Sequence, residues 1–446
     1  MSLLDPLFRD ARMQALFSDR SRLQRMLDFE AALARAEARC GVIPAAAAPV
    51  IAKHCDATAF DLNAIGVASA KAGNPAIPLV KLLTQRVAAV DAEAARWVHW
   101  GATSQDVMDT GLVLQQREAF HLLNSRLNEL VTVLVGIVRE HRNSILPGRT
   151  WLQQAVPVTF GYKAAVWLDA ILRCRSRLRE VLPRLGVLQF GGAAGTLASL
   201  DSRGLDVAQA LGAELGLSVP EIPWHSSRDR IVEAGSVVAL LAGSLGKIAR
   251  DISLMSQTEV GEVFEPAEEG RGGSSTMPHK RNPVGCSIAI SASVRIPGLV
   301  ATLFAAQPQE HERGLGNWPA EWETLPEIFT LTAGSLGAMT QVLSGLEVDT
   351  ARMLRNLDLS QGLLYAERVT FRLAEKLGKH AAHELTTLAC QRAVATGKSL
   401  KETLAADTKV MAVLAATDLD AVFDPAQALG STQGFIDRVL AAAGRG

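Results

Sequence analysis

The residues most able to do chemistry lie in one loop-like run, residues 270–283, which reads GRGGSSTMPHKRNP. Its glycines leave the backbone free to move, and two serines follow them. A basic cluster, residues 279–281, comes next, and Asn282-Pro283 is typical of the first residues of a helix. A flexible serine loop beside a cationic helix start is typical of a lid that contains a base and an oxyanion site.

A second polar segment, residues 99–106, reads HWGATSQD and precedes a run with helical periodicity. It starts at His99 and offers the hydroxyl groups of Thr103 and Ser104. Helix N-termini attract anions through their free N–H groups and their dipole. The segment is therefore a candidate carboxylate site, although Thr103 or Ser104 could equally cap a helix with no further role.

A third segment, residues 148–157, reads GRTWLQQAVP and places Arg149, Thr150 and Gln153 between two expected helices. These side chains are hydrogen-bonding and cationic, which suits the binding of a polar substrate. A plain helix-to-helix turn is the alternative interpretation.

Together, these segments resemble the aspartase/fumarase superfamily, whose signature is similar to GSSTMPHKRNP at residues 273–283. WVHWGATSQDVMDT and GRTWLQQAVPVTFG resemble the two substrate regions of that family and occur in its order. TEVGEVFEP, at residues 258–266, resembles the run that leads into the signature. The resemblance covers most of residues 95–325.

The resemblance implies a role for each matching residue of the serine loop. Ser274 is expected to be the base and acid at carbon. Lys280 and Asn282 are expected to hold the carboxylate that becomes enediolate-like. Because a serine is a very weak base in water, its alkoxide must be stabilised by backbone N–H groups and by Lys280.

The same resemblance implies binding roles and an assembly. Thr103 and Ser104 are expected to bind another carboxylate, with Thr150 and Gln153 nearby. Members of the family form homotetramers around a twenty-helix bundle, with each active site shared between subunits. The family needs no cofactor for this chemistry, and the sequence has no metal-binding motif.

One position departs from the family pattern, because Thr150-Trp151 stands where Thr-His is usual. In the lyases that histidine assists protonation of the departing group. A carboxylate leaving group needs no acid, since it is a stable anion at neutral pH. Trp151, as a substrate-binding residue, therefore favours a branch that closes a carboxylate onto a double bond. A drifted, inactive copy is the alternative.

A second departure follows His311-Glu312-Arg313, where Trp318 and Trp322 replace residues that grip a nucleotide phosphate in adenylosuccinate lyases. A tryptophan cannot balance the charge of a phosphate, and its bulk fills space. This disfavours a nucleotide and favours a small tricarboxylate held by Lys280 and Arg313. Substrate contact stays open for His99, Arg149, Arg281, His225 and Arg230. For Arg149, a structural ion pair is the favoured interpretation.

The expected activity is that of the bacterial branch that lactonises 3-carboxymuconate in aromatic-acid breakdown. The runner-up is an adenylosuccinate lyase-like enzyme that releases fumarate. A structural protein on the same scaffold, as in some lens crystallins, is a third interpretation. Retention of Ser274, Lys280 and Asn282 argues against it.

Composition excludes several other classes of protein. A formal net charge of -1 argues against a nucleic-acid partner. The 5 cysteines form no CxxC pair, which fits a reducing compartment. The N-terminus is charged too early for a signal peptide, and no apolar run approaches the roughly 20 residues of a membrane span. We expect a cytoplasmic protein with no membrane partner.

The elements that position these segments are predicted to be helices. Long proline-free stretches and apolar residues at three- and four-residue steps, over residues 122–138 and 231–255, predict long helices. Few segments alternate as strands do. We predict an all-α fold in three domains: residues 1–110, a long-helix bundle at 111–355, and a helical domain at 356–446.

Overall fold

The computed structural model describes residues 3–267, 272–273, 277 and 280–445. Helices dominate these residues, and the strands among them form two small two-stranded sheets. The predicted all-α class is confirmed. Packing divides the chain into two compact units. Unit 1 comprises Met1–Leu127, Cys174–Gly246 and Ile288–Gly337, and unit 2 comprises Asn128–Arg173, Lys247–Ser287 and Ala338–Gly446.

The longest helices contain the boundaries between the units. They are α8 (Ser104–Glu140), α9 (Phe160–Leu185), α11 (Asp229–Met255), α12 (Val284–Ala306) and α13 (Asn317–Ser344). The periodic runs at residues 122–138 and 231–255 lie in α8 and α11, as predicted. Proline is a weaker boundary signal than expected, because Pro183, Pro297 and Pro326 lie inside helices. A proline costs a helix about 3 kcal/mol, which packing over many turns can offset.

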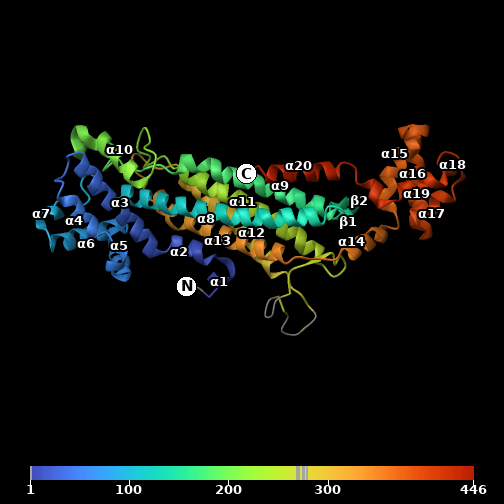
Figure 1. The fold of residues 1–446 in the computed structure, drawn as a ribbon, viewed down its shortest axis with the longest axis horizontal. Helices are drawn as coiled ribbons and strands as arrows, with labels where there is room; N and C mark the ends of the chain where they lie inside the picture. Colours follow the sequence, from blue (N-terminus) through green and yellow to red (C-terminus); the bar gives the residue numbers. More distant parts are fainter. Residues whose placement is uncertain (1–2, 268–271, 274–276, 278–279, 446) are drawn as a thin grey trace. The chain divides into compact units, whose positions relative to one another are not determined.

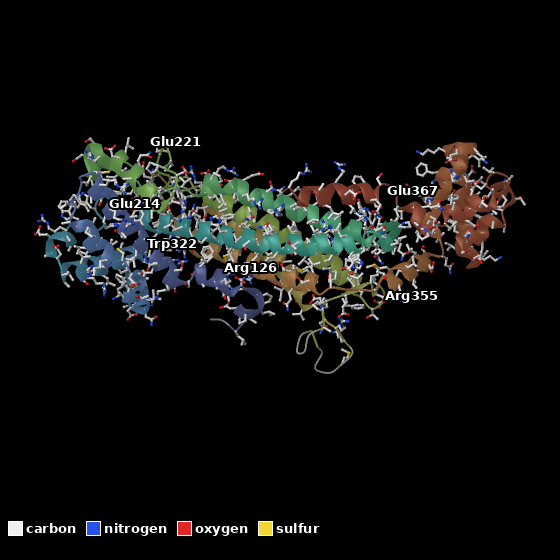
Figure 2. All side chains as sticks on the ribbon, viewed as in Figure 1. Arg126, Glu214, Glu221, Trp322, Arg355 and Glu367 are labelled. Atoms are coloured by element: carbon white, nitrogen blue, oxygen red, sulfur yellow. The ribbon has the colours of Figure 1, made fainter. Side chains whose placement is uncertain are left out.

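Unit 1 gathers the N-terminal helices around α3 (Figure 1). Its shorter elements are α1 (Asp5–Phe8), α2 (Ala11–Leu16), α3 (Asp19–Arg39), α4 (Ala47–Lys53), η1 (Ala57–Ala59), α5 (Leu62–Ala72), α6 (Ala76–Ala88), α7 (Ala92–Ala95), η2 (Ala198–Arg203) and α10 (Gly204–Leu215). Helix α3 packs against α4 and α10, and Glu214 of α10, labelled in Figure 2, pairs with Arg35 and Arg39 of α3. Phe120 and Phe329 meet edge to face in its core.

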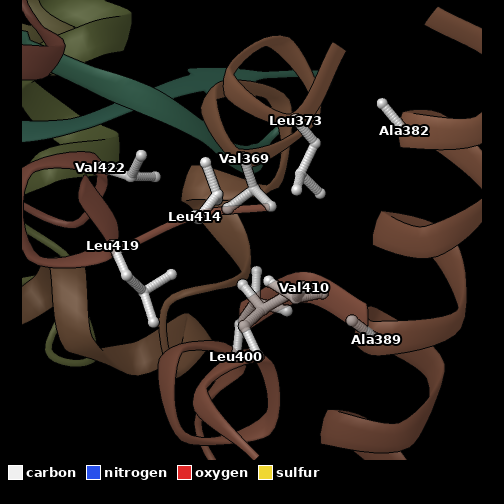
Figure 3. Packing of buried hydrophobic residues seen from close by; sticks show 10 residues of the cluster. Val369, Leu373, Ala382, Ala389, Leu400, Val410, Leu414, Leu419 and Val422 are labelled. Carbon is white, nitrogen blue, oxygen red and sulfur yellow. The ribbon is translucent and has the colours of Figure 1, made fainter. Parts of the chain in front are cut away.

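Unit 2 contains the strands and the C-terminal helices. Its elements are β1 (Ile145–Thr150), β2 (Gln153–Thr159), β3 (Val263–Phe264), β4 (Glu347–Val348), α14 (Thr350–Asn356), η3 (Leu357–Ser360), η4 (Leu363–Tyr365), α15 (Ala366–Leu377), α16 (Lys379–Thr396), α17 (Leu400–Ala405), α18 (Thr408–Met411), α19 (Ala416–Val422), η5 (Pro425–Ala428) and α20 (Thr432–Ala443). Helices α15 to α19 share an aliphatic core in which Val369, Leu373 and Leu400 are fully buried (Figure 3).

The segment at residues 148–157 was expected to be a polar connection or a plain turn between two helices, and the structure shows neither. It belongs to a β-hairpin in which β1 pairs antiparallel with β2, with Thr150 opposite Gln153 and a bulge between Pro147 and Arg149. The turn is Trp151-Leu152, with φ of 51° and 65°. Such turns usually carry Asn-Gly or Asp-Gly, so the sequence lacks the pattern that predicts them.

Two helices, α11 and α12, are long and apolar enough to cross a membrane by length and composition. The expectation that no segment approaches this limit is therefore wrong, because scattered polar residues hide the high average hydropathy. The finding is weak evidence for a membrane, since core helices of water-soluble proteins pass the same test. The three predicted domains stay a prediction, because compact packing units need not coincide with them.

Candidate active site

The polar segment at residues 99–106 lies in unit 1 and leads into α8. The backbone N–H of Thr103 donates to Asp106 Oδ2 at 3.0 Å, which is half of a capping box. Gly101 has a φ of 70°, and a Cβ there would lie 2.6 Å from Leu200. Thr103 and Ser104 are half-buried. The segment is thus held in one shape, with its hydroxyl groups at a helix start as expected.

Asp106, in the first turn of α8, binds two other segments of unit 1. Its fully buried carboxylate accepts hydrogen bonds from the backbone of Gly191 and Gly192 at 3.0 and 2.9 Å. His225 donates through Nε2 at 2.7 Å. Three segments far apart in sequence therefore meet on one carboxylate. The sequence prediction missed Asp106, although its place three residues after Thr103 is a capping signal.

Arg313 reaches the same place from the segment before α13. Its Nη2 donates to Thr103 Oγ1 and to the carbonyl oxygen of Ala193, both at 3.0 Å. No ion pair joins Arg313 to an acidic residue in the part of the chain that the structure describes. A guanidinium that touches only neutral oxygens retains its capacity for an anion. Thr103 and Arg313, both predicted from sequence, are thus brought together.

His99 begins the segment and is held from behind. Its Nδ1 lies 2.6 Å from Oε1 of the buried Glu30, and its φ is 59°. His225, left open by the sequence, is buried against Asp106 rather than exposed to a ligand. Arg230 lies over the ring of Trp224, 5.9 Å from its centroid.

Trp318 contacts a buried ionic cluster in unit 1, and Trp322 packs against Trp318. Arg228 is fully buried and pairs with Asp109 at 2.7 Å and with Glu321 at 2.5 Å. Trp318 donates through Nε1 to Asp109 Oδ1 at 3.1 Å and meets Trp322 edge to face. Trp318 is 6% exposed, so its indole fills the interior of unit 1. Exclusion of a nucleotide by Trp318 and Trp322 stays a prediction.

The hairpin tip in unit 2 presents its side chains to the surroundings. Within unit 2, Trp151 is 98% exposed and Leu152 is 75% exposed, while Thr150 and Gln153 are also exposed. Arg149 turns back and binds Glu262 through two hydrogen bonds of 2.9 and 2.6 Å. Arg149 is therefore a structural ion pair, as the sequence analysis favoured.

The end of the serine loop, also in unit 2, borders a cavity of about 220 Å³. Lys280 and Asn282 line it together with Gly272 and Gly273. The backbone of Asn282 donates to the carbonyl of Gly272 at 2.9 Å, and a Cβ on Gly272 would lie 2.7 Å from the carbonyl oxygen of Asn282. Glycine is therefore required where the loop closes on itself. Ser274 lies outside the described residues.

Two neighbours fix this cavity. Glu265 accepts from the backbone N–H groups of Gly285 and Cys286 at 3.0 and 2.8 Å, which caps the start of α12. Arg281 makes two 2.8 Å hydrogen bonds to Glu347, which raise the pKa of its guanidinium. Arg281 therefore has a structural partner, which leaves Lys280 as the cation of this cavity among the described residues.

Comparison with known families agrees with this arrangement. The lyase family model matches residues 9–298, and the adenylosuccinate lyase C-terminus model matches residues 362–439. The chain belongs to the fumarase/aspartase superfamily. The 3-carboxy-cis,cis-muconate cycloisomerase of Pseudomonas aeruginosa is 57% identical over 98% of this chain and 96% of that protein. Nitrosuccinate lyase of Streptomyces davaonensis is 42% identical over 98% and 94%.

Solved structures of the superfamily have the same fold. The crystal structure of 3-carboxy-cis,cis-muconate lactonizing enzyme from Pseudomonas putida has a TM-score of 0.94 and 52% identity, covering 99% of both chains. That of β-carboxy-cis,cis-muconate cycloisomerase from Acinetobacter calcoaceticus has a TM-score of 0.93 and 41% identity, covering 99% of this chain and 100% of that chain. The predicted superfamily and its helical fold are therefore confirmed.

The candidate residues divide between the two units, and the candidates of each unit are called a half-site below. Unit 1 contains His99, Thr103, Ser104 and Arg313 over Asp106. Unit 2 contains a second set: Thr150, Trp151, Gln153, Lys280 and Asn282. The first half-site offers hydroxyl and guanidinium donors for a carboxylate, and the second offers a lysine, an asparagine and an exposed indole. Each half-site can bind an anionic group, and neither contains a metal-ligating cluster among the described residues.

Proposed function

We propose that this chain is a 3-carboxy-cis,cis-muconate cycloisomerase, which closes a substrate carboxylate onto the substrate's own double bond. The product is carboxymuconolactone, formed during protocatechuate breakdown. The observation that carries the proposal is Trp151, fully exposed at a hairpin tip where related lyases have an acid-assisting histidine. In the reverse reaction the leaving group is a carboxylate, which needs no acid. The 57% identical Pseudomonas aeruginosa protein supports the same reaction.

The proposed chemistry forms one C–O bond and one C–H bond. The attacking carboxylate oxygen bonds to one alkene carbon, and the π electrons pass to the neighbouring carbon, next to another carboxylate. Lys280 and Asn282 hold that carboxylate as it becomes enediolate-like, because a cation and an amide stabilise the added charge. Ser274 then delivers a proton to the carbon. In reverse, the Ser274 alkoxide removes it.

The first half-site is proposed to bind a second carboxylate of this small tricarboxylate. Arg313 is the cation, and Thr103 and Ser104 add hydroxyl groups at the start of α8. The support is the guanidinium of Arg313, which touches only two neutral oxygens among the described residues. His99 lies on the same segment, and the hairpin residues Thr150, Trp151 and Gln153 are proposed to contact the substrate as well.

We also propose that the protein is a homotetramer whose active sites are shared between subunits. Support comes from α12, where only 22% of the most apolar 18-residue window is buried within the chain. Val294 and Phe304 on this helix are 71% and 56% exposed. A helix with such an apolar exposed surface is stable in water when other subunits cover it. A light-scattering mass of about four chains is the expected result.

No cofactor, nucleic acid or membrane enters the proposal. The reaction needs only proton transfer and charge stabilisation, and the net charge of -1 gives no basic excess for nucleic acid. All 5 cysteines are free, which agrees with a reducing compartment such as the cytoplasm.

One assay tests the activity directly. The protein is incubated with 3-carboxymuconate and, separately, with adenylosuccinate, and loss of the diene absorbance or release of fumarate is followed. We expect turnover of the first substrate; turnover of the second alone would establish the alternative lyase, which the match to the adenylosuccinate lyase C-terminus keeps in view. Ser274→Ala should lower kcat by at least about a hundredfold with binding retained. A smaller loss would show that Ser274 is not the proton donor.

A further inference from the structure

His99 is fixed to the interior of unit 1 by a single carboxylate. Glu30 on α3 has a side chain with no exposed area, and its Oε1 lies 2.6 Å from His99 Nδ1. The other oxygen, Oε2, has no partner in the described part of the chain. His99 itself is 17% exposed at the side chain and has a φ of 59°. A strained backbone and a short hydrogen bond together hold the imidazole in one orientation.

The charges around this pair favour an imidazolium. Asp106 of α8 adds a second negative charge that acts on His99, whereas Glu37, the other buried carboxyl of α3, is protonated near neutral pH and adds none. The thiol of Cys55 is also buried near Glu30, and burial raises its pKa, so it is neutral and does not balance the charge of Glu30. Loss of the His99 proton would leave Glu30 as a buried carboxylate without a counter-charge, which is costly. Burial lowers the pKa of His99, but the charge and hydrogen bond of Glu30, together with Asp106, raise it overall.

The second ring nitrogen of His99 is available. No hydrogen bond joins Nε2 to a protein group among the described residues, and the side chain is partly exposed. The hydrogen bond at Nδ1 determines the direction in which Nε2–H points. His99 also lies four residues before Thr103, whose hydroxyl already accepts from Arg313. An imidazolium on this segment adds a cationic N–H donor to the hydroxyl groups and the guanidinium of the same half-site.

We propose that Glu30 is a positioning residue that keeps His99 protonated and aims its Nε2–H at a carboxylate of the substrate. The proposal rests on the proposed function for the identity of that carboxylate. Glu30 touches no substrate and acts through His99. Protonated His99 is then the pH-dependent part of the carboxylate site.

Titration of His99 by NMR tests the first half of the proposal without any substrate. The ring C–H signal of His99 is assigned by its absence in His99→Gln. Glu30→Gln, which removes the charge and keeps the shape, should lower the pKa of His99 by about one to three pH units. An unchanged pKa would overturn the proposal. Glu37→Gln is the matched control, because it lies on the same helix, is equally buried and does not touch His99; it should leave the titration unchanged.

The pH profile of kcat/KM with 3-carboxymuconate tests the second half. Because the protonated form binds the anion, kcat/KM should fall as pH rises through the pKa of His99. In Glu30→Gln the fall should begin at lower pH, with a loss of roughly tenfold or more near pH 7.5 and near-equal values at acidic pH. The loss should be mainly in KM.

His99→Gln gives an independent result if Glu30→Gln does not fold. It should lose the basic limb of the profile, and a retained limb would overturn the role of His99 in binding. The two halves separate from the proposed function: without turnover of 3-carboxymuconate the cycloisomerase assignment fails, while the NMR titration still decides whether Glu30 controls His99.

Discussion

Glu37→Gln is expected to stabilise the folded chain by an amount that grows with pH. Glu37 has no exposed area, and neither of its carboxyl oxygens has a partner among the described residues. Burial, followed by the charge of Glu30, raises the pKa of Glu37 from 4.5 to about 9. At neutral pH this carboxyl is therefore protonated in the folded chain and ionised in the unfolded chain.

The sign of the effect follows from proton linkage. Above pH 4.5 the unfolded chain releases this proton while the folded chain retains it, so folding is weakened progressively up to about pH 9. Each pH unit corresponds to about 1.4 kcal/mol, so the cost is about 3 kcal/mol near pH 7 and about 5 kcal/mol near pH 8. Glutamine is neutral in both states and removes this cost.

The measurement is the difference in melting temperature between Glu37→Gln and the parent chain from pH 5.5 to pH 8. The difference should increase steadily with pH. Glu129→Gln, on an exposed face of α8, makes the same chemical change in water and should show no such trend. A difference that is the same at pH 5.5 and pH 8 would refute the reasoning, because it would mean that Glu37 is ionised in the folded chain.

Two further changes test the site. Asp106→Asn replaces an acceptor of several N–H groups with an amide, so the free energy of unfolding should fall by about 2–4 kcal/mol and KM should rise, as thermal melts and steady-state rates would show; a folded variant with unchanged KM would contradict its role under Thr103. Trp151→His restores the histidine of related lyases and should give no gain in lactonising rate. A tenfold gain in kcat/KM would show that the leaving group does need an acid.

Much of the fold was predictable because long amphipathic helices repeat one signal over many turns. The runs at residues 122–138 and 231–255 lie within α8 and α11 for that reason. The candidate residues Thr103 and Arg313 were also found from their motifs, and the structure brings them together. Each lies in a short segment whose residue types are typical of anion binding.

The residues that sequence analysis missed act over long distances. Glu30 lies 69 residues from His99, and Gly191 lies 85 residues from Asp106. Glu30 lies on the buried face of α3, but nothing in its local sequence identifies His99 as its partner. Only the folded chain shows that a buried carboxylate has a histidine as its partner, so such a positioning residue requires a structure.

The turn residues of the β1–β2 hairpin are unusual for their backbone conformation, which is why the sequence did not predict a hairpin there. A two-residue turn with both φ angles positive favours Asn-Gly, whereas this one carries Trp151-Leu152 at φ of 51° and 65°. Each such residue costs roughly 1 kcal/mol or more, and an indole that is 98% exposed within unit 2 gains nothing from burial there. Turn formation alone does not explain why Trp and Leu occupy these two positions. A binding role for Trp151 accounts for both the strain and the exposure, because contact with a substrate or another subunit would bury the indole and offset the cost.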